Sequence, residues 1–431
     1  YFGKLPARGP SESLGRPWLR RLALAGVCLL QASAGVYYAA FACFLIFVAG
    51  IAGGIERRRL QPLAVAGLLI ALTAAGVAAN IAPSLIYWAR HGRNPEVAQR
   101  SVYQAELFGL KIAQLVLPTT GHRWRPLAEL RDRYHHSSLT PNENDSVTLG
   151  TVGAFGFAAL VFRALFMRRR QNELLDALST LNLAALMLAT IGGFGVMFNL
   201  LVDPSIRCYN RIGVFLGFFA LTAIAHLMQP WAVGWGRGSW LQGLGYGLLG
   251  AVLVLGVLDQ APPCLIPVPN WVSPDRATVA EQFRSDAEFV ARIEAIAPPG
   301  AMIYQIPYVN FPESTPYHGL GPYDQFRPYL HSKRLRWSFG SMQGRETDLW
   351  RRSVARLPMP EQLAALRQVG FSGVMVCRLA FTDDGRRLEG ELNRLLDAAP
   401  LVSRDQKLAY FPLDGDSTRL APTSTVAGAR P

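Results

Sequence analysis

Polar side chains that could bind a phosphate and move a proton gather in the segment 90–146. His122 and Arg123 follow an apolar stretch closely, and cations of this kind suit the phosphate or diphosphate of a lipid carrier. Glu143 or Glu106 could assist as a base by deprotonating an acceptor hydroxyl. The cations could instead anchor the segment to anionic lipid headgroups, and both interpretations stay open. The candidates here are Glu106, Lys111, His122, Arg123, Arg125, Asn142, Glu143 and Asn144.

A second candidate phosphate site is the short segment 203–211 between two apolar runs. It carries Arg207 and Arg211, and the membrane topology given below leaves both on the outer side, against the usual distribution of positive charge. Phosphate binding would explain their position. A salt bridge from Asp203 to either arginine would explain it equally.

The segment 306–346 interleaves aromatic rings with cations and lies after a predicted strand. Arg334, Arg336 and Trp337 are its candidate binding residues, because aromatic faces beside cationic donors suit sugar rings and phosphates. The same residue types suit docking against a membrane interface or against transmembrane helices. No nucleophile elbow, phosphate-binding glycine motif or catalytic triad accompanies them.

Cysteine and histidine spacing predicts no metal site. None of the five cysteines has zinc-type spacing, and His135 and His136 form no helical ligand pair. A divalent cation, Mg²⁺ or Mn²⁺, stays open as a cofactor without assigned ligands. Cys208 and Cys264 both fall at the predicted outer surface, where a disulfide would be permitted, and unpaired thiols are the alternative.

The composition is that of a membrane protein with an attached soluble domain. Charged residues make up 17% of the 431 residues and apolar residues 50%, and the mean hydropathy is +0.18. Residues 1–258 hold 23 Lys and Arg against 11 Asp and Glu, whereas residues 259–431 hold 20 against 19. Because the positive excess accompanies apolar runs, it indicates membrane topology and argues against nucleic acid as a partner.

Apolar runs predict an α-helical bundle of about seven membrane passes over residues 22–258. The first run, 22–55, is interrupted at 31–35, which favours two short helices over one strongly tilted helix. The other predicted passes are 63–88, 147–167, 178–202, 212–228 and 240–258. A further helix over 102–117 is expected along the membrane surface.

Seven passes place every arginine cluster on one side of the membrane. The clusters are those of the leading segment 1–21, the triplets 57–59 and 168–170, and Arg237. The positive-inside rule makes that side cytoplasmic. The loop 90–146 and everything after residue 258 are then extracytoplasmic, and the lipid bilayer is a partner.

A small α/β domain is predicted to follow the bundle. Residues 259–276 form a proline-rich linker, 277–413 the extracytoplasmic domain and 414–431 a disordered tail. Helices are expected at 277–296, 361–369 and 386–398, and strands at 301–306, 373–379, 401–403 and 408–412.

Several segments, in this order, resemble the C-terminal portion of bacterial polytopic membrane glycosyltransferases of the C superfamily and of the related YfhO-like group. The stretches are GVYYAAFACFLIFVAG (35–50), NIAPSLIYW (80–88), AELFGLKIAQLVLP (105–118) with His122 and Arg123, NEN (142–144) with TLGTVGAFGF (148–157), IRCYNRIGVF (206–215), and the block from QIPYVNFPE to YLHSKRLRWSFGSMQGR (305–345). The resemblance spans most of residues 20–412.

The resemblance implies transfer of a sugar from a polyprenyl-phosphate donor to an envelope or surface glycan acceptor, outside the inner membrane. Such proteins usually carry the catalytic acid in an earlier external loop, and a chain that starts at Tyr1 is expected to lack it. Whether this chain is itself an enzyme therefore stays open. The alternatives are a transporter or flippase of lipid-linked sugars and a non-catalytic assembly protein of the envelope.

Overall fold

The computed structural model describes residues 17–97, 99–137, 147–167, 172–233, 240–261, 276–314 and 317–413. These residues form two compact units. The first contains the residues up to Gly92 and those from Gln99 to Ala261, and it is helical. The second joins the five residues Arg93–Val97 to the residues from Arg276 onward. The predicted tail, most of the linker, most of the leading segment and the arginine triplet 168–170 lie outside the described residues.

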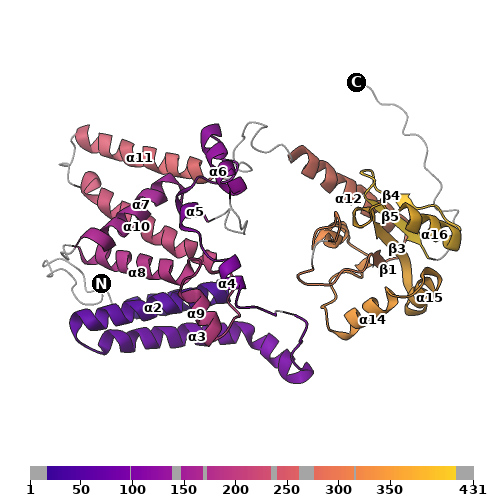
Figure 1. The fold of residues 1–431 in the computed structure, drawn as a ribbon, viewed down its shortest axis with the longest axis horizontal. Coiled ribbons are helices and arrows are strands. Elements are labelled where there is room, and N and C mark those ends of the chain that lie inside the picture. The colour runs from indigo at the N-terminus through magenta and orange to yellow at the C-terminus, as the bar shows by residue number, and fades with distance from the viewer. Residues whose placement is uncertain are drawn as a thin grey trace. The chain divides into compact units, whose positions relative to one another are not determined.

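The first unit is a bundle of long antiparallel helices (Figure 1). Its core contains Phe41 and Leu45 from one helix, and Leu160 and Leu216 from two others. Close helix approach depends on small residues: a Cβ on Gly156 would overlap the backbone oxygen of Ala220. The long helices are α1 (Pro17–Ser33), α2 (Val36–Arg57), α3 (Gln61–His91), α7 (Gly150–Phe166), α8 (Glu173–Ala189), α10 (Gly213–Val233) and α11 (Trp240–Gln260).

Among the described residues, four helices are long and apolar enough to cross a membrane, fewer than the seven passes predicted. They are Val36–Arg57, Gln61–His91, Tyr209–Gln229 and Gly243–Gln260. Each of α1, α7 and α8 has 17 residues. At 1.5 Å per residue such a helix measures about 25 Å, less than the hydrocarbon thickness of about 30 Å.

Two predicted helices are interrupted, and a backbone pairing between them explains both breaks. The pass expected over 178–202 ends with α8 at Ala189 and resumes as α9 (Phe194–Leu201), with Gly192 between them at φ 72°. The surface helix expected over 102–117 is instead α4 (Gln104–Leu107) and α5 (Ile112–Val116). Between them, Leu110 donates its N–H to the Ala189 carbonyl and accepts one from Ile191, at 2.8 and 3.3 Å.

The break expected at 31–35 is confirmed. Helix α1 ends at Ser33 and α2 begins at Val36. Gly35 lies between them at φ 116°, in the region that favours glycine.

The second unit is an α/β domain with a mixed five-stranded sheet in the order β2-β1-β3-β5-β4. Strands β2 (Arg336–Trp337), β1 (Met302–Ile306) and β3 (Phe371–Cys377) are parallel, whereas β5 (Leu408–Pro412) and β4 (Leu401–Val402) add antiparallel pairs. The strands expected after residue 300 are confirmed to within a few residues. The two-residue strand β2 was not predicted.

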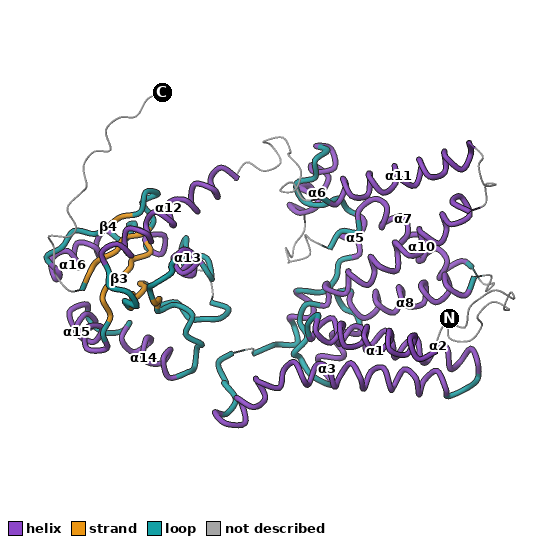
Figure 2. The backbone as a smooth tube through the Cα atoms, turned by 180° about the vertical axis from the view of Figure 1, so that it is seen from behind, coloured by secondary structure: helices purple, strands orange, loops and turns teal. Residues whose placement is uncertain are grey.

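Alternating side chains of the strands give the sheet two apolar faces, and helices cover both. Ile303 and Met375 pack with Phe289 of α12 (Arg276–Ile296). Val374 and Val376 lie on the other face, with α14 (Glu346–Val354), α15 (Met359–Val369) and α16 (Arg386–Leu396). The backbone view in Figure 2 shows these helices around the strands.

Candidate functional site

Short elements meet at one end of the bundle and bring two candidate segments together. The first runs from α4 to α5, and the second runs from α9 into the turn η2 (Tyr209–Ile212). Asn210 donates its backbone N–H to the Phe108 carbonyl at 3.3 Å, which ties the two segments directly. The pairing of Leu110 with Ala189 and Ile191 joins the first segment to the end of α8.

Arg207 and Arg211 each lie over an aromatic ring of a neighbouring element. The guanidinium carbon of Arg207 is 5.2 Å from the ring centre of Phe108, and that of Arg211 is 5.0 Å from Tyr37 at the start of α2. Arg211 is exposed and Arg207 half-buried. These distances fit cation–π contacts, and the exposed guanidinium of Arg211 can also bind an oxyanion.

The turn that carries these arginines is held by buried polar contacts. Tyr209 donates its hydroxyl to Oδ1 of Asn199 at 2.7 Å, and Asn199 donates its Nδ2 to the Ile206 carbonyl at 2.8 Å. Asn210 is buried, and its side-chain Oδ1 accepts no hydrogen bond from the described part of the chain. The segment therefore presents a fixed pair of cations beside a buried amide oxygen that can still accept a donor.

The other candidates of this end have identifiable positions. Glu106 accepts the N–H of Gly192 at 2.9 Å, so its carboxylate holds the loop between α8 and α9. Lys111 is half-buried and follows Leu110 directly. Glu143 lies outside the described residues. Sequence reasoning placed all three in one loop and did not foresee the contact with Gly192.

His122 and Arg123 belong to a different contact, at the end of α11. His122 is 5% exposed; its Nε2 is 3.1 Å from Oδ1 of Asp259, and its Nδ1 accepts the N–H of Trp124 at 3.0 Å. Arg123 donates to the Ala261 carbonyl at 3.3 Å. With both ring nitrogens engaged inside the unit, the imidazole of His122 acts as a structural connector in this conformation.

Asp259 joins this contact to the first turn of α7. Its carboxylate accepts the backbone N–H of Thr151 at 2.7 Å and the Thr151 hydroxyl at 3.2 Å. A carboxylate at a helix N-terminus satisfies an unpaired N–H and interacts favourably with the helix dipole. Gly150, at φ 67°, leaves room for the end of α11, because an added Cβ would collide with the side chains of Asp259 and Gln260.

The candidates Arg334, Arg336 and Trp337 lie in the α/β domain. Arg336 and Trp337 form the edge strand β2, and Arg334 donates to the Glu294 carbonyl at 2.9 Å. Desolvation opposes ionisation of the Glu294 side chain, but backbone hydrogen bonds from Arg334 and Lys333 outweigh it and lower the pKa of that carboxyl. The exposed cations here are therefore held on an ordered turn.

Residues Arg93–Val97, which follow α3 after Gly92, are built into the α/β domain. Asn94 donates its Nδ2 to the Gln343 carbonyl at 2.7 Å, and Gln343 donates its Nε2 to the Glu96 carbonyl at 2.8 Å. Nη2 of Arg352 is 2.7 Å from Oε2 of Glu96. We call this set of contacts the clasp. Hydropathy and strand patterns carry no signal for it, because the partners are about 250 residues apart in sequence.

Asp348 supports the clasp from inside the domain. It is fully buried and accepts the Tyr308 hydroxyl at 2.7 Å, Nη2 of Arg352 at 2.8 Å and the Gly344 N–H at 3.1 Å. The side-chain nitrogens of Arg351 are buried and have no hydrogen-bond partner among the described residues, and burial lowers the pKa of this group. Asp348 thus supplies negative charge to two arginines.

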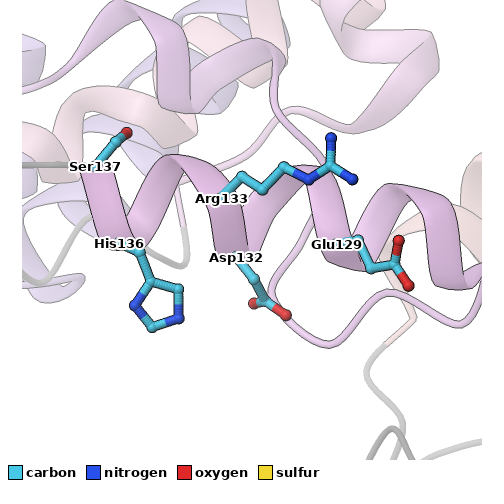
Figure 3. A pocket seen from close by; sticks show the side chains of 5 residues that line it. All are labelled: Glu129, Asp132, Arg133, His136 and Ser137. Carbon is cyan, nitrogen blue, oxygen red and sulfur yellow. The ribbon is translucent and has the colours of Figure 1, made fainter.

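A shallow hollow lies along helix α6 (Arg125–Ser137) and is lined by residues of that helix alone (Figure 3). Asp132 and His136 project from the same side of the helix, and Glu129, which also lines the hollow, is paired with Arg125 at 2.9 Å. Within the described ranges, no three His, Cys, Asp or Glu side chains are placed to hold a metal ion. Cys208 is buried, and Cys264 lies outside those ranges, so their disulfide stays a prediction.

Comparison of the chain with protein-family models, curated proteins and solved structures gave no match. Its function must therefore be argued from these residues.

Proposed function

We propose that the end of the bundle formed by α4, α9 and η2 binds the phosphate of a polyprenyl-phosphate-linked sugar. The observation that carries this proposal is the pair Arg207 and Arg211, which precede and follow Asn210 in the sequence. Each guanidinium lies over an aromatic ring of a neighbouring element. Two guanidinium groups can neutralise a phosphate or diphosphate and bond its oxygens. The buried Oδ1 of Asn210 can accept a sugar hydroxyl.

This position suits a lipid substrate. Tyr209–Gln229 and Val36–Arg57 are both long and apolar enough to cross a membrane. Arg211 lies within the first of these, and Tyr37 lies within the second. Membrane insertion of these two helices would put both side chains at helix ends, at the depth where lipid phosphates lie.

The clasp supports a common side for the loop after α3 and the α/β domain. Because Arg93–Val97 is part of the domain, the end of α3 and the domain must face the same compartment. Two candidate spans, Tyr209–Gln229 and Gly243–Gln260, lie between them in sequence, and two crossings return the chain to that side. The arginine-rich opposite loops make this side extracytoplasmic by the positive-inside rule.

We therefore infer a membrane glycosyltransferase that moves a sugar from the lipid donor to an envelope or surface glycan on the outer face of the bacterial inner membrane. Arg207, Arg211 and Lys111 hold the donor, and Glu106 orders the loop between α8 and α9. Glu143 remains the candidate assisting base. His122 and Arg123 maintain the bundle end, and Arg334, Arg336 and Trp337 are available to the acceptor glycan.

The test is sugar transfer in proteoliposomes that contain a polyprenyl-phosphate-linked sugar and an acceptor glycan. Replacing Arg207 and Arg211 together with Ala should abolish transfer at unchanged protein level. The matched control replaces Arg90 of α3 and Arg133 of α6, two exposed cations, and removes the same charge from other elements. Transfer that is equal in both variants would remove the phosphate role.

Transport of the lipid-linked sugar is a second candidate, favoured by one observation in the bundle core. Asn182, in the middle of α8, is 1% exposed, and neither side-chain amide atom has a hydrogen-bond partner within the described residues. Buried polar groups at membrane depth often mark a substrate path. Flipping of a fluorescent lipid-linked sugar can be measured in liposomes that contain the protein. Flipping that is present in wild type and lost in Asn182→Leu would favour transport.

A further inference from the structure

The α/β domain carries a continuous exposed apolar ridge across α12, α13 (Arg327–His331) and the loops beside them. Phe283 on α12 is 62% exposed and Leu330 on α13 is 71% exposed. Monomeric soluble domains rarely leave such groups together in water. The ridge consists of Val279, Phe283, Tyr323, Tyr329, Leu330 and Met342.

Ring contacts make the ridge one surface. Phe283 packs against His331 with ring centres 4.4 Å apart, which joins α12 to α13. Phe326 connects Tyr329 to Phe311, at 6.2 and 5.3 Å. Phe311 in turn contacts Tyr323 and pairs with Met342, beside the clasp residue Gln343. Val369 and Leu395 are also exposed but are not part of the ridge. They belong to α15 and α16, which cover the opposite face of the sheet.

Exposed cations lie beside the ridge, and the exposed acid Glu281, two residues before Phe283, is paired with Arg404 at 2.9 Å. Arg284 follows Phe283 and Lys333 lies three residues after Leu330, and both are exposed. Asp286, the buried acid nearest in sequence to Phe283, is bonded through both oxygens to Arg327 at 2.8 Å. Exposed cations next to aromatic and aliphatic groups are typical of surfaces that enter the headgroup region of an anionic membrane.

The chain enters the domain directly from the end of a candidate membrane span. Helix α3 has 31 residues, which at 1.5 Å per residue is about 46 Å. A bilayer measures about 40–45 Å including its headgroups. Gly92 alone separates α3 from Arg93–Val97, so the chain passes from a candidate span into the domain without a linker.

We propose that the ridge docks the α/β domain on the anionic bilayer in which the bundle is embedded, with Phe283 and Leu330 inserted among the headgroups. This proposal rests on the membrane insertion proposed above and is independent of the sugar chemistry. A domain seated in this way would place its sheet next to the membrane surface, where a lipid-linked substrate is presented.

The test measures collisions of a nitroxide label with oxygen, which partitions into lipid, and with a nickel chelate, which stays in water. A keto amino acid at position 283 or 330 of the full chain carries the label, in nanodiscs with anionic lipid. Leu68 of α3, which is 69% exposed, reports membrane insertion itself, and Leu395 of α16 is the matched control on the domain.

We expect the ratio of oxygen to nickel collisions at 283 and 330 to shift toward that of Leu68, with Leu395 remaining water-like. Arg284→Gln with Lys333→Gln should weaken docking about fivefold for each charge. Nickel collisions at 283 and 330 equal to those at Leu395 would overturn the proposal, as would protection from both reagents, which indicates protein contact. A water-like Leu68 would instead refute membrane insertion.

Discussion

Replacing Asp348 with Ala should destabilise the α/β domain more than any exposed substitution in it. The variant leaves the Tyr308 hydroxyl and the Gly344 N–H without their acceptor. It also removes the carboxylate beside Arg351 and Arg352. Loss of one partner of a buried charged pair costs about 3–5 kcal/mol, a large share of the roughly 5–15 kcal/mol that stabilises a domain.

Asp348→Asn is the matched control, because the amide oxygen can still accept from Gly344 while its NH2 group can donate to the Tyr308 hydroxyl, and only the charge is lost. We expect an intermediate loss of about 1–3 kcal/mol. Glu96→Gln removes only the partly exposed end of the clasp, where the carboxylate is 36% exposed. Such a pair contributes about 1 kcal/mol or less.

Pulse proteolysis of the full chain in detergent over a urea series measures these differences. Cleavage within 276–413 reports the unfolded fraction of the domain. The expected order of stability is wild type, Glu96→Gln, Asp348→Asn and Asp348→Ala. Our account of the clasp is wrong if Asp348→Ala unfolds at the same urea concentration as Glu96→Gln.

Three further outcomes follow from particular contacts. Gly156→Ala should lower the melting temperature in detergent, at a cost of about 1–3 kcal/mol from overpacking, whereas Gly250→Ala, which meets open space, should not. Burial raises the pKa of Tyr304 to about 12 from 10.0. The neutral side chain therefore adds to the free energy of unfolding below pH 10, and this stabilisation is lost toward pH 12. Urea unfolding measures the decrease in the free energy of unfolding between about pH 9 and about pH 11.5. This decrease should be about 2 kcal/mol smaller in Tyr304→Phe than in wild type. Asp259→Ala should lower the melting temperature by removing the cap of α7, at about 1–3 kcal/mol, and Asp259→Asn should lower it less.

Hydropathy and periodicity were sufficient to predict most helices and strands, because burial of apolar side chains decides them locally. The interruption of the apolar run at 31–35 predicted the break between α1 and α2, where Gly35 has φ 116°. The α/β domain followed from the alternation of helix and strand between 277 and 412. The number of passes was overestimated, since α7 is shorter than its apolar run 147–167 and the run 178–202 is broken after Ala189, where α8 ends.

The breaks at Phe108–Lys111 and at Thr190–Gly193 could not be predicted from either segment alone. Each interrupts an apolar run that favours a continuous helix, and the pairing of Leu110 with Ala189 and Ile191 compensates the lost helical bonds. The stacking of Arg207 on Phe108 depends on the same long-range pairing. Residue types indicated cations at the ends of apolar runs, but only tertiary contacts show which elements these cations meet.

Binding of polyprenyl phosphate to the purified full chain, measured by native mass spectrometry, tests the central claim most directly. Polyprenol without the phosphate is the comparison ligand. Wild type and the Arg90→Ala, Arg133→Ala variant should retain the phosphorylated lipid and bind polyprenol weakly. Arg207→Ala with Arg211→Ala should lose about tenfold or more in affinity for each arginine, for the phosphorylated lipid only. Equal retention of both lipids, or undiminished binding without these two arginines, would contradict the proposed phosphate site.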